Sequence, residues 1–389
     1  MRPMRGAGPD SHPPARDNPA ARSLRDIRME HSVSTPSIIS PHVRHPLCHN
    51  RTVRPKLLFL ALALLLGATA GYPQWLETQI ALPDSLGGAL YPTCLTTDTS
   101  ERYVYIGDYG LEDPGGGHVG GGVYVVDAEA RTRVAKIPFG FISAVCTNTR
   151  QNKVYAADYA GNRVFVISCA TNQVVATIPT GANPLALCYN STDDKVYVAN
   201  GDSNDLTVID CASDNVIKTI RFGESPAGLC YNPASNRVFC EMNDTLVVID
   251  GASDSVAAVH AGVWWGHMTV DAVANKVYLD GVALDGTTGV VLDTLKYGWS
   301  VSCLNSRTQK LYTCDKDDPY VHVFDCIADT PVARLRRHVV DDICSMACDT
   351  VVNRVYVACN VGQWGEVLVV DGVADTTAAW LPGPYWVNC

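Results

Sequence analysis

A glycine-rich segment is the first place where the sequence suggests chemistry. Gly115-Gly116-Gly117-His118-Val119-Gly120 satisfies the G-x-G-x-x-G pattern of dinucleotide-binding loops. That motif acts by presenting a helix N-terminus to a pyrophosphate. Here the run Val123-Tyr124-Val125-Val126-Asp127 follows and predicts a strand instead. We therefore interpret the segment as a loop between strands and predict no cofactor.

Side chains that bind metals form no complete pattern. Residues 202–205 and 315–318 are rich in carboxylates, and calcium there stays an alternative, but neither segment completes an EF-hand loop. Asp and Asn are also ordinary turn formers. Cys344 and Cys348 have the wrong spacing for a zinc knuckle, and no histidine pair accompanies them. We predict no metal site.

No catalytic set is visible either. The sequence lacks a G-x-S-x-G elbow and an H-E-x-x-H motif. The histidines that follow residue 70 are dispersed; they are His118, His260, His267, His322 and His338. We predict no catalytic residue, and hydrolysis is unsupported rather than excluded.

The cysteines follow the repeat described below. Cys146, Cys188, Cys230 and Cys303 occupy one equivalent position, and Cys169, Cys211 and Cys326 occupy another. Gly, Ala or Thr stands at the same positions elsewhere, so we favour small packing residues over disulfides. Spacing alone leaves disulfide pairing open.

The charge distribution argues against nucleic acid as a partner. Residues 1–56 hold ten basic and four acidic side chains, which leaves 20 basic and 36 acidic ones in the rest of the chain. A body this acidic repels phosphate backbones.

The N-terminal region predicts export. Arg51, Arg54 and Lys56 precede an apolar run over residues 57–66, and Ala68-Thr69-Ala70 follows. This order is typical of a secretory signal peptide, and the run is too short to span a bilayer. We predict a signal peptide over residues 51–70 and a secreted product (periplasmic, extracellular or at the cell surface) with no membrane span after cleavage. Residues 1–50 are interpreted either as a disordered extension or as the result of a start codon placed too far upstream.

A short phrase of a basic residue, an aliphatic one and an aromatic one recurs seven times and organises the rest of the chain. Its aromatic positions are separated by 34 to 50 residues, the period of a four-stranded propeller blade; they are residues 105, 155, 197, 239, 278, 312 and 356. Residues 183–222 show four strand-like pieces separated by turns and no helical periodicity. We predict an all-β protein, a seven-bladed β-propeller of four-stranded antiparallel blades, as one domain over residues 71–389.

The repeats resemble the YVTN-type β-propeller family of secreted and surface-layer proteins. Tyr197-Val198-Ala199-Asn200 is the nearest match to that signature, and the resemblance covers about residues 75–385. It implies an exported propeller. Some propellers of similar repeat are lactonases or related hydrolases with a site at the central channel, which is the alternative function.

The chain ends raise a question of ring closure. Residues 76–83 read as an outer strand that joins the last blade and latches the ring. Residues 377–381 also read as an outer strand, which leaves one strand too many. Either the last blade is irregular or the chain is a fragment, in which case residues 384–389 open a further first strand.

Aromatic residues gather in loops that topology places on one face. In an antiparallel blade, the loop entering strand one and the loop joining strands two and three emerge on the same side. We predict a contact surface there, for function in rigid β scaffolds is usually carried by loops; its residues are Tyr91, Phe141, Trp264, Trp265, His267, Trp299 and Trp364. The competing interpretation is that these rings only pack between blades.

These observations favour an exported, monomeric, non-catalytic binding module. The expected partner is a protein, a peptide or a glycan of unknown identity, bound through the aromatic loop face.

Overall fold

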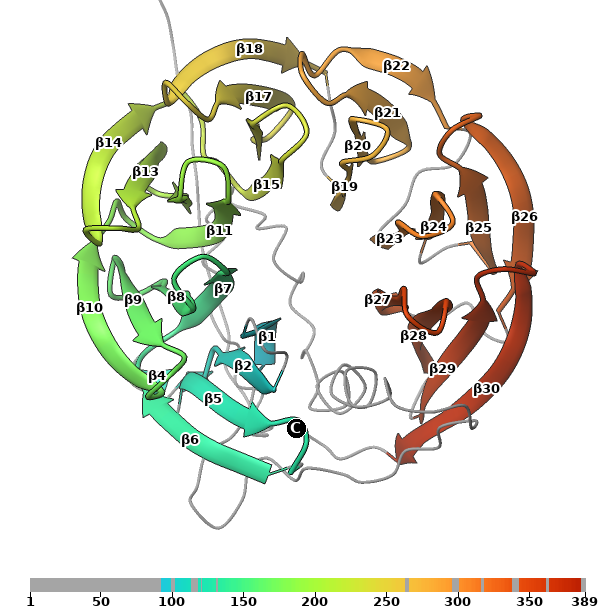
Figure 1. Cartoon of the computed structure of the whole chain (residues 1–389), viewed down its shortest axis with the longest axis horizontal. Helices are drawn as coiled ribbons and strands as arrows, with labels where there is room; N and C mark the ends of the chain where they lie inside the picture. The colour runs from blue at the N-terminus through green and yellow to red at the C-terminus, as the bar shows by residue number, and fades with distance from the viewer. Residues whose placement is uncertain are drawn as a thin grey trace, which may run out of the picture. The chain divides into compact units, whose positions relative to one another are not determined.

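The computed structural model describes residues 92–98, 102–112, 118–119, 121–130, 132–262, 266–295, 301–315, 318–337, 343–361 and 364–385. Over these residues the chain forms strands β1 to β30 and no helix. All but β3 (Leu111–Glu112) and β4 (His118–Val119) build seven four-stranded antiparallel sheets. Figure 1 shows the sheets following one another around a common axis, with the first strand of each sheet innermost. The prediction of a seven-bladed β-propeller is confirmed.

Each blade is one continuous stretch of chain. Blade 1 has β1 (Pro92–Thr97), β2 (Tyr103–Asp108), β5 (Gly122–Asp127) and β6 (Thr132–Pro138). Blade 2 has β7 (Ile142–Asn148), β8 (Lys153–Asp158), β9 (Arg163–Ser168) and β10 (Gln173–Pro179). Blade 3 has β11 (Pro184–Asn190), β12 (Lys195–Asn200), β13 (Asp205–Asp210) and β14 (Asn215–Arg221). Blade 4 has β15 (Gly228–Asn232), β16 (Arg237–Glu241), β17 (Thr245–Asp250) and β18 (Ser255–Ala261).

The last three blades keep the same order. Blade 5 has the shorter strands β19 (Met268–Asp271), β20 (Lys276–Leu279), β21 (Val282–Asp285) and β22 (Val291–Thr294). Blade 6 has β23 (Val301–Asn305), β24 (Lys310–Cys314), β25 (Tyr320–Asp325) and β26 (Thr330–Arg336). Blade 7 has β27 (Ile343–Asp349), β28 (Arg354–Val361), β29 (Trp364–Asp371) and β30 (Thr376–Tyr385).

The core lies between blades. Strands β12 and β13 are almost completely buried, whereas the outer strand β14 is mostly exposed. One apolar cluster joins Tyr197 and Leu206 of blade 3 to Val238 and Ile249 of blade 4. Each sheet therefore hides its two faces against its neighbours, as a propeller requires.

The turns on one side of the ring are set by residues with a left-handed backbone. Asp194 and Asn236 end the turns between the first and second strands of blades 3 and 4, and Asp214 and Asp254 end those between the third and fourth. Asn and Asp tolerate positive φ better than other side-chain-bearing residues. We call this side the turn face. The opposite side, where first strands begin, is the entry face.

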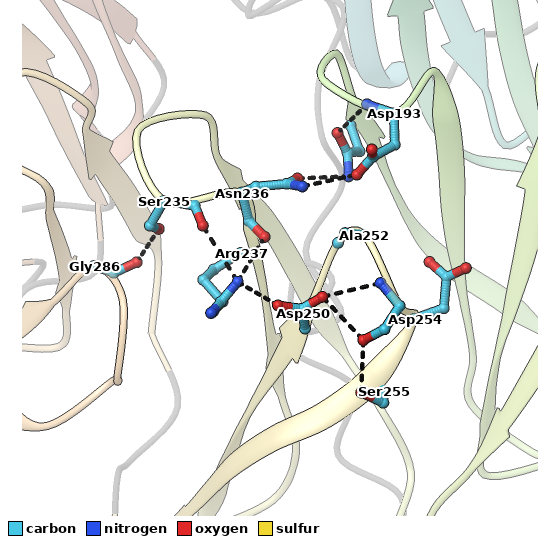
Figure 2. Close-up of polar contacts among 12 residues, drawn as sticks. Asp193, Ser235, Asn236, Arg237, Asp250, Ala252, Asp254, Ser255 and Gly286 are labelled. Carbon is cyan, nitrogen blue, oxygen red and sulfur yellow. Dashed lines mark hydrogen bonds and ion pairs between the residues drawn. The ribbon is translucent and has the colours of Figure 1, made fainter.

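Asparagines tie the turns of adjacent blades together. Asn190 ends β11, and its Oδ1 accepts the turn N–H groups of Thr192 and Asp193 at 2.9 and 3.0 Å. Its Nδ2 donates to Asn236 Oδ1 of the next blade at 3.0 Å. Figure 2 shows Asn236 reaching back to Asp193, at 2.8 Å from Nδ2 to Oδ2. Asn148, Asn232 and Asn305 donate across the next interface in the same way.

The repeated basic and aromatic residues form a second link between blades. Lys195 Nζ lies 2.9 Å from Asp254 Oδ2, and the Tyr197 hydroxyl donates to Asp254 Oδ1. Asp254 belongs to the turn before the outer strand of the following blade. The same arrangement joins Lys153 and Tyr155 to Asp214, and Lys310 and Tyr312 to Asp375. The repeated phrase is therefore a clamp on the next blade as well as a strand.

Lysine and arginine at this position form ion pairs with different partners. Blades 1, 4 and 7 carry arginine, which pairs within its own blade: Arg102 with Asp127, Arg237 with Asp250 and Arg354 with Asp371. Figure 2 shows the Arg237–Asp250 pair, at 2.7 Å from Nη1 to Oδ2. The turn facing blade 4 has Gly289 and the turn facing blade 1 has Asn172 where blades 3, 4, 6 and 7 have aspartate, so the carboxylate that pairs with lysine elsewhere is missing from both turns.

Other local predictions can be compared with the structure. The short strands β3 and β4 pair with each other, and strand β5, not a helix, is the next described element after β4; the glycines of the motif lie outside the described residues. Asp280 and Gly281 have positive φ, as the predicted two-residue turn of blade 5 requires. Blade 7 has four strands of its own, and Tyr385 ends β30 instead of opening a further first strand. Residues 1–91, including the predicted signal peptide and strand 76–83, lie outside the described residues.

Candidate functional site

The predicted contact surface is only partly covered by the described residues. Tyr91, Trp264, Trp265 and Trp299 lie outside them, and for Trp364 only its place at the start of β29 is described. Phe141 is 3% exposed, with its ring centroid 3.9 Å from that of Tyr109. It therefore packs between blades and offers little surface. His267 is the remaining predicted residue, and it is exposed at the entry face.

His267 is held by two hydroxyl groups from adjacent blades. Its Nδ1 lies 3.2 Å from Ser302 Oγ on β23 and 3.4 Å from Thr269 Oγ1 on β19. The two hydroxyl oxygens are 2.6 Å apart. Thr269 and Ser302 are buried. The imidazole is thus oriented by two side chains that are almost completely buried.

The hydrogen-bond arrangement is compatible with the tautomer of His267 that is protonated on Nε2. If Thr269 donates to Ser302 and Ser302 donates to Nδ1, both hydroxyl protons are used within the triangle. Nδ1 is then an acceptor and Nε2 carries the proton. In that tautomer, the neutral imidazole offers an N–H donor at the inner rim of the entry face.

A buried carboxyl hydrogen-bonds to the backbone of the residue before this histidine. Glu241 ends β16, is 3% exposed, and its Oε1 accepts the N–H of Gly266 at 3.0 Å. Burial raises the pKa of Glu241 to about 7, the charge of Asp280 adds to that effect, and the Gly266 N–H opposes it. A Cβ at residue 228 would lie 2.7 Å from Glu241 Oε2, so a larger residue there would have to displace the Glu241 carboxyl. We call Glu241, Gly266, His267, Thr269 and Ser302 the rim cluster.

Antiparallel pairing explains why the rim cluster forms. Gly228, the first residue of β15, pairs with Glu241, the last residue of β16. The starts of first strands and the ends of second strands therefore share the entry face. Sequence reasoning identified His267 but missed Glu241, Thr269 and Ser302. One signal was available, because Thr269 stands where four other blades have cysteine.

The rim cluster lacks the parts of a hydrolytic triad. Among the described residues, no carboxylate hydrogen-bonds to His267, and Ser302 is 3% exposed with its hydroxyl already engaged. A nucleophilic serine needs access to substrate and a base oriented by a third group. The geometry instead suits a fixed imidazole that forms a hydrogen bond with a polar group of a ligand.

The other chemical candidates are engaged in the structure. Asp205 Oδ1 accepts from Asn200 at 2.8 Å and from Ser203 at 3.1 Å, so this carboxylate stabilises its own loop. The described residues contain no group of three His, Cys, Asp or Glu that could hold a metal ion. Free thiols agree with the packing interpretation at Cys146, Cys169, Cys188, Cys211, Cys230, Cys240, Cys303, Cys326 and Cys348. Burial raises the pKa of Cys211 and of Cys230 to about 12, which makes these thiols unreactive.

The side chain of His267 should titrate below the usual histidine range. Burial of the ring by the inner strands lowers its pKa, although water still reaches one side. We expect a midpoint below 6.5 in an NMR titration of the ring nitrogens. A midpoint above 6.5 would mean that the Glu241 or Asp280 charge outweighs burial.

Comparison with known proteins defines the class. No protein-family model matches the chain, and no curated protein matches it. Among solved structures, Kuenenia stuttgartiensis hydrazine synthase superposes with a TM-score of 0.51 and 14% identity over 75% of this chain and 99% of that chain. Dihydro-heme d1 dehydrogenase NirN in complex with DHE superposes with a TM-score of 0.59 and 12% sequence identity. This match covers 74% of this chain and 64% of the NirN chain.

Both neighbours are β-propeller proteins. At these identities the likeness concerns the fold alone. The chain is accordingly a seven-bladed β-propeller. Its described residues include no helix long and apolar enough to cross a membrane.

Proposed function

We propose that this propeller is an exported, monomeric binding module of the YVTN type that contacts a protein, peptide or glycan at the entry face of blades 4–6. The single observation that carries the proposal is the convergence of His267, Thr269 and Ser302 from two adjacent blades. Two buried hydroxyls fix an exposed imidazole and leave its Nε2 for a ligand. A preorganised imidazole of this kind loses little entropy on binding.

The predicted aromatic residues support the same location. Trp264 and Trp265 directly precede the Gly266–His267 pair in the sequence, and Trp299 lies shortly before Ser302. Tryptophan provides a large stacking surface for sugars and peptides, and it is enriched among residues that dominate binding energy. We propose these three residues as the apolar part of the contact surface, with His267 as its polar part.

The alternative function is a lactonase-like hydrolase. The observation in its favour is the 3.2 Å contact between His267 Nδ1 and Ser302 Oγ. Burial of Ser302 weighs against it, because an attacking oxygen must reach the substrate. Hydrolysis of a lactone panel that is lost in Ser302→Ala would establish the enzyme instead of the binding module.

The binding proposal is tested by a glycan array and a peptide library, followed by calorimetry on the strongest hit. We expect His267→Ala, Trp265→Ala and Trp299→Ala each to weaken that hit by about tenfold or more, as residues that dominate an interface do. His260→Ala is the matched control and should leave the affinity unchanged. If all three entry-face variants bind every hit as well as the original protein, the proposed surface is wrong.

A further inference from the structure

The interface between blades 4 and 5 lacks the clamp that joins other blades. Arg237 and Phe239 stand there in place of the lysine and the tyrosine, and Gly289 stands in place of the aspartate. Phe239 has no hydroxyl to donate, and Arg237 pairs with Asp250 of its own blade at 2.7 Å. These clamp positions therefore form no ion pair and no hydroxyl hydrogen bond from one blade to the other. We call this boundary the unclamped interface.

The other interfaces whose clamp positions the structure describes keep at least one such bond. A lysine and an aspartate join blades 2 and 3, 3 and 4, 5 and 6, and 6 and 7. Blades 1 and 2 lack the lysine, but the Tyr105 hydroxyl donates to Asn172 Oδ1 at 2.5 Å. Because each blade of such an array contacts only its two neighbours, the ring is expected to open at its weakest interface.

The contacts that cross the unclamped interface are hydrogen bonds and apolar packing. Asn232 Nδ2 donates to Asn275 Oδ1 at 2.8 Å, as equivalent asparagines do elsewhere in the ring. His260 Nε2 lies 2.7 Å from the Thr288 carbonyl oxygen, but this contact is exposed, so water can replace it. Between described residues, no ion pair joins blade 4 to blade 5.

Blade 5 also has a weakly paired outer strand. Its strand β22 has four residues, all of them exposed, and pairs with β21 at three positions. In blade 4, strand β18 pairs with β17 at six positions. Segments with few buried contacts and exposed backbone hydrogen bonds open at a lower free energy than the rest of a protein. Blade 5 is thus the neighbour that can move at this interface.

The rim cluster spans the unclamped interface. Glu241 ends the second strand of blade 4, whereas Gly266 leads into blade 5, and the hydrogen bond between them crosses the boundary at 3.0 Å. His267 follows Gly266 and contacts Ser302 of blade 6. Separation of blades 4 and 5 would therefore leave Glu241 without the Gly266 N–H and would move it away from His267.

We propose that the ring opens between blades 4 and 5, and that this opening takes the rim cluster apart. The closed ring holds Glu241 and His267 together, and the open ring does not. A ligand that contacts both blades binds only the closed state and so shifts the population toward it. The role of the ligand rests on the proposed function, whereas the opening itself does not.

Four cysteines report on four interfaces from equivalent positions of the first strands. Cys146 lies between blades 2 and 3, Cys188 between blades 3 and 4, and Cys303 between blades 6 and 7. Cys230 lies at the unclamped interface, with its Sγ 3.7 Å from Met268 Sδ of blade 5. Burial raises the pKa of Cys230 to about 12, and the thiolate is the reacting form, so alkylation of this thiol reports its exposure to water.

Pulsed alkylation of the folded protein with N-ethylmaleimide, followed by mass spectrometry, tests the proposal without any ligand. We expect Cys230 to react about tenfold faster or more than Cys146 and Cys303, because the clamped interfaces open less often. These two are the matched controls, since they are half-buried like Cys230. Equal rates for the three thiols would overturn the proposal.

A triple variant transfers the residues of the unclamped interface to blades 3 and 4. In Lys195→Arg/Tyr197→Phe/Asp254→Gly, we expect Cys188 to react about tenfold faster than in the original protein, because the buried pair is lost. An unchanged Cys188 rate in a variant with the original circular dichroism spectrum would overturn the proposal. If the variant does not fold, the comparison of thiols in the original protein decides. Neither measurement uses a ligand, so a failure here is distinct from a failure of the binding experiment.

Discussion

Replacing Asp254 with alanine is expected to lower the free energy of unfolding by about 3 kcal/mol, the lower end of the range for breaking a buried ion pair. The variant leaves the Lys195 ammonium and the Tyr197 hydroxyl without their shared acceptor between blades 3 and 4. The Lys195 side chain is 12% exposed and that of Asp254 9% exposed, so water replaces the lost contacts poorly. Urea denaturation followed by tryptophan fluorescence measures the loss.

The arginine of a same-blade pair supplies the control for this experiment. Arg354→Ala removes a partner of Asp371, but the two side chains are 36% and 32% exposed. Exposed pairs contribute about 0–1 kcal/mol. Equal losses in Asp254→Ala and Arg354→Ala would contradict the view that the lysine clamps hold blades together.

Replacing Glu241 with glutamine is expected to remove a pH-dependent loss of stability. Glu241 is buried, and its pKa is raised to about 7 in the folded protein against a reference value of 4.5. The amide of glutamine can still accept the Gly266 N–H. At pH 8 we expect the variant to be more stable than the original protein by about 3 kcal/mol, because each pKa unit corresponds to about 1.4 kcal/mol.

The direction of this effect follows from proton binding. Between pH 4.5 and about 7, the unfolded chain has lost the Glu241 proton while the folded chain retains it. Folding then takes up a proton, and stability falls as the pH rises through this window. Denaturation midpoints of the two proteins at a series of pH values measure the difference. Glu224→Gln, at an exposed glutamate before β15, is the control; parallel curves for Glu241→Gln and the original would refute the prediction.

The repeat made much of the fold predictable. Alternating β-branched and aromatic residues, separated by Asn- and Asp-rich turns, define four strands in each copy, and the predicted strand at residues 195–199 lies within β12. These signals are local, because strand propensity and left-handed turn residues act over a few positions. Blade 7 was harder, since residues 377–381 and 384–385 belong to one unusually long strand, β30.

The candidate site was predictable only in part. His267 was recognisable as a polar residue at the start of a first strand, but its partner Ser302 lies in the next blade. Nothing in the sequence near Glu241 shows that Gly266 would bind it or that burial would raise its pKa. For Phe141 the sequence suggested an exposed contact residue in an entering loop, whereas its ring is 3% exposed and packs against Tyr109.

The amino-acid sequence by itself determined the number of blades, the order of strands and the turns, since these depend on side chains a few residues apart. Only the tertiary structure decided that the repeated lysine and tyrosine bind the next blade's aspartate, and that His267, Thr269 and Ser302 meet. Such contacts depend on how one sheet stacks on the next. Stacking is driven by apolar burial, which has no direction of its own and leaves the polar partners to be set by the final geometry.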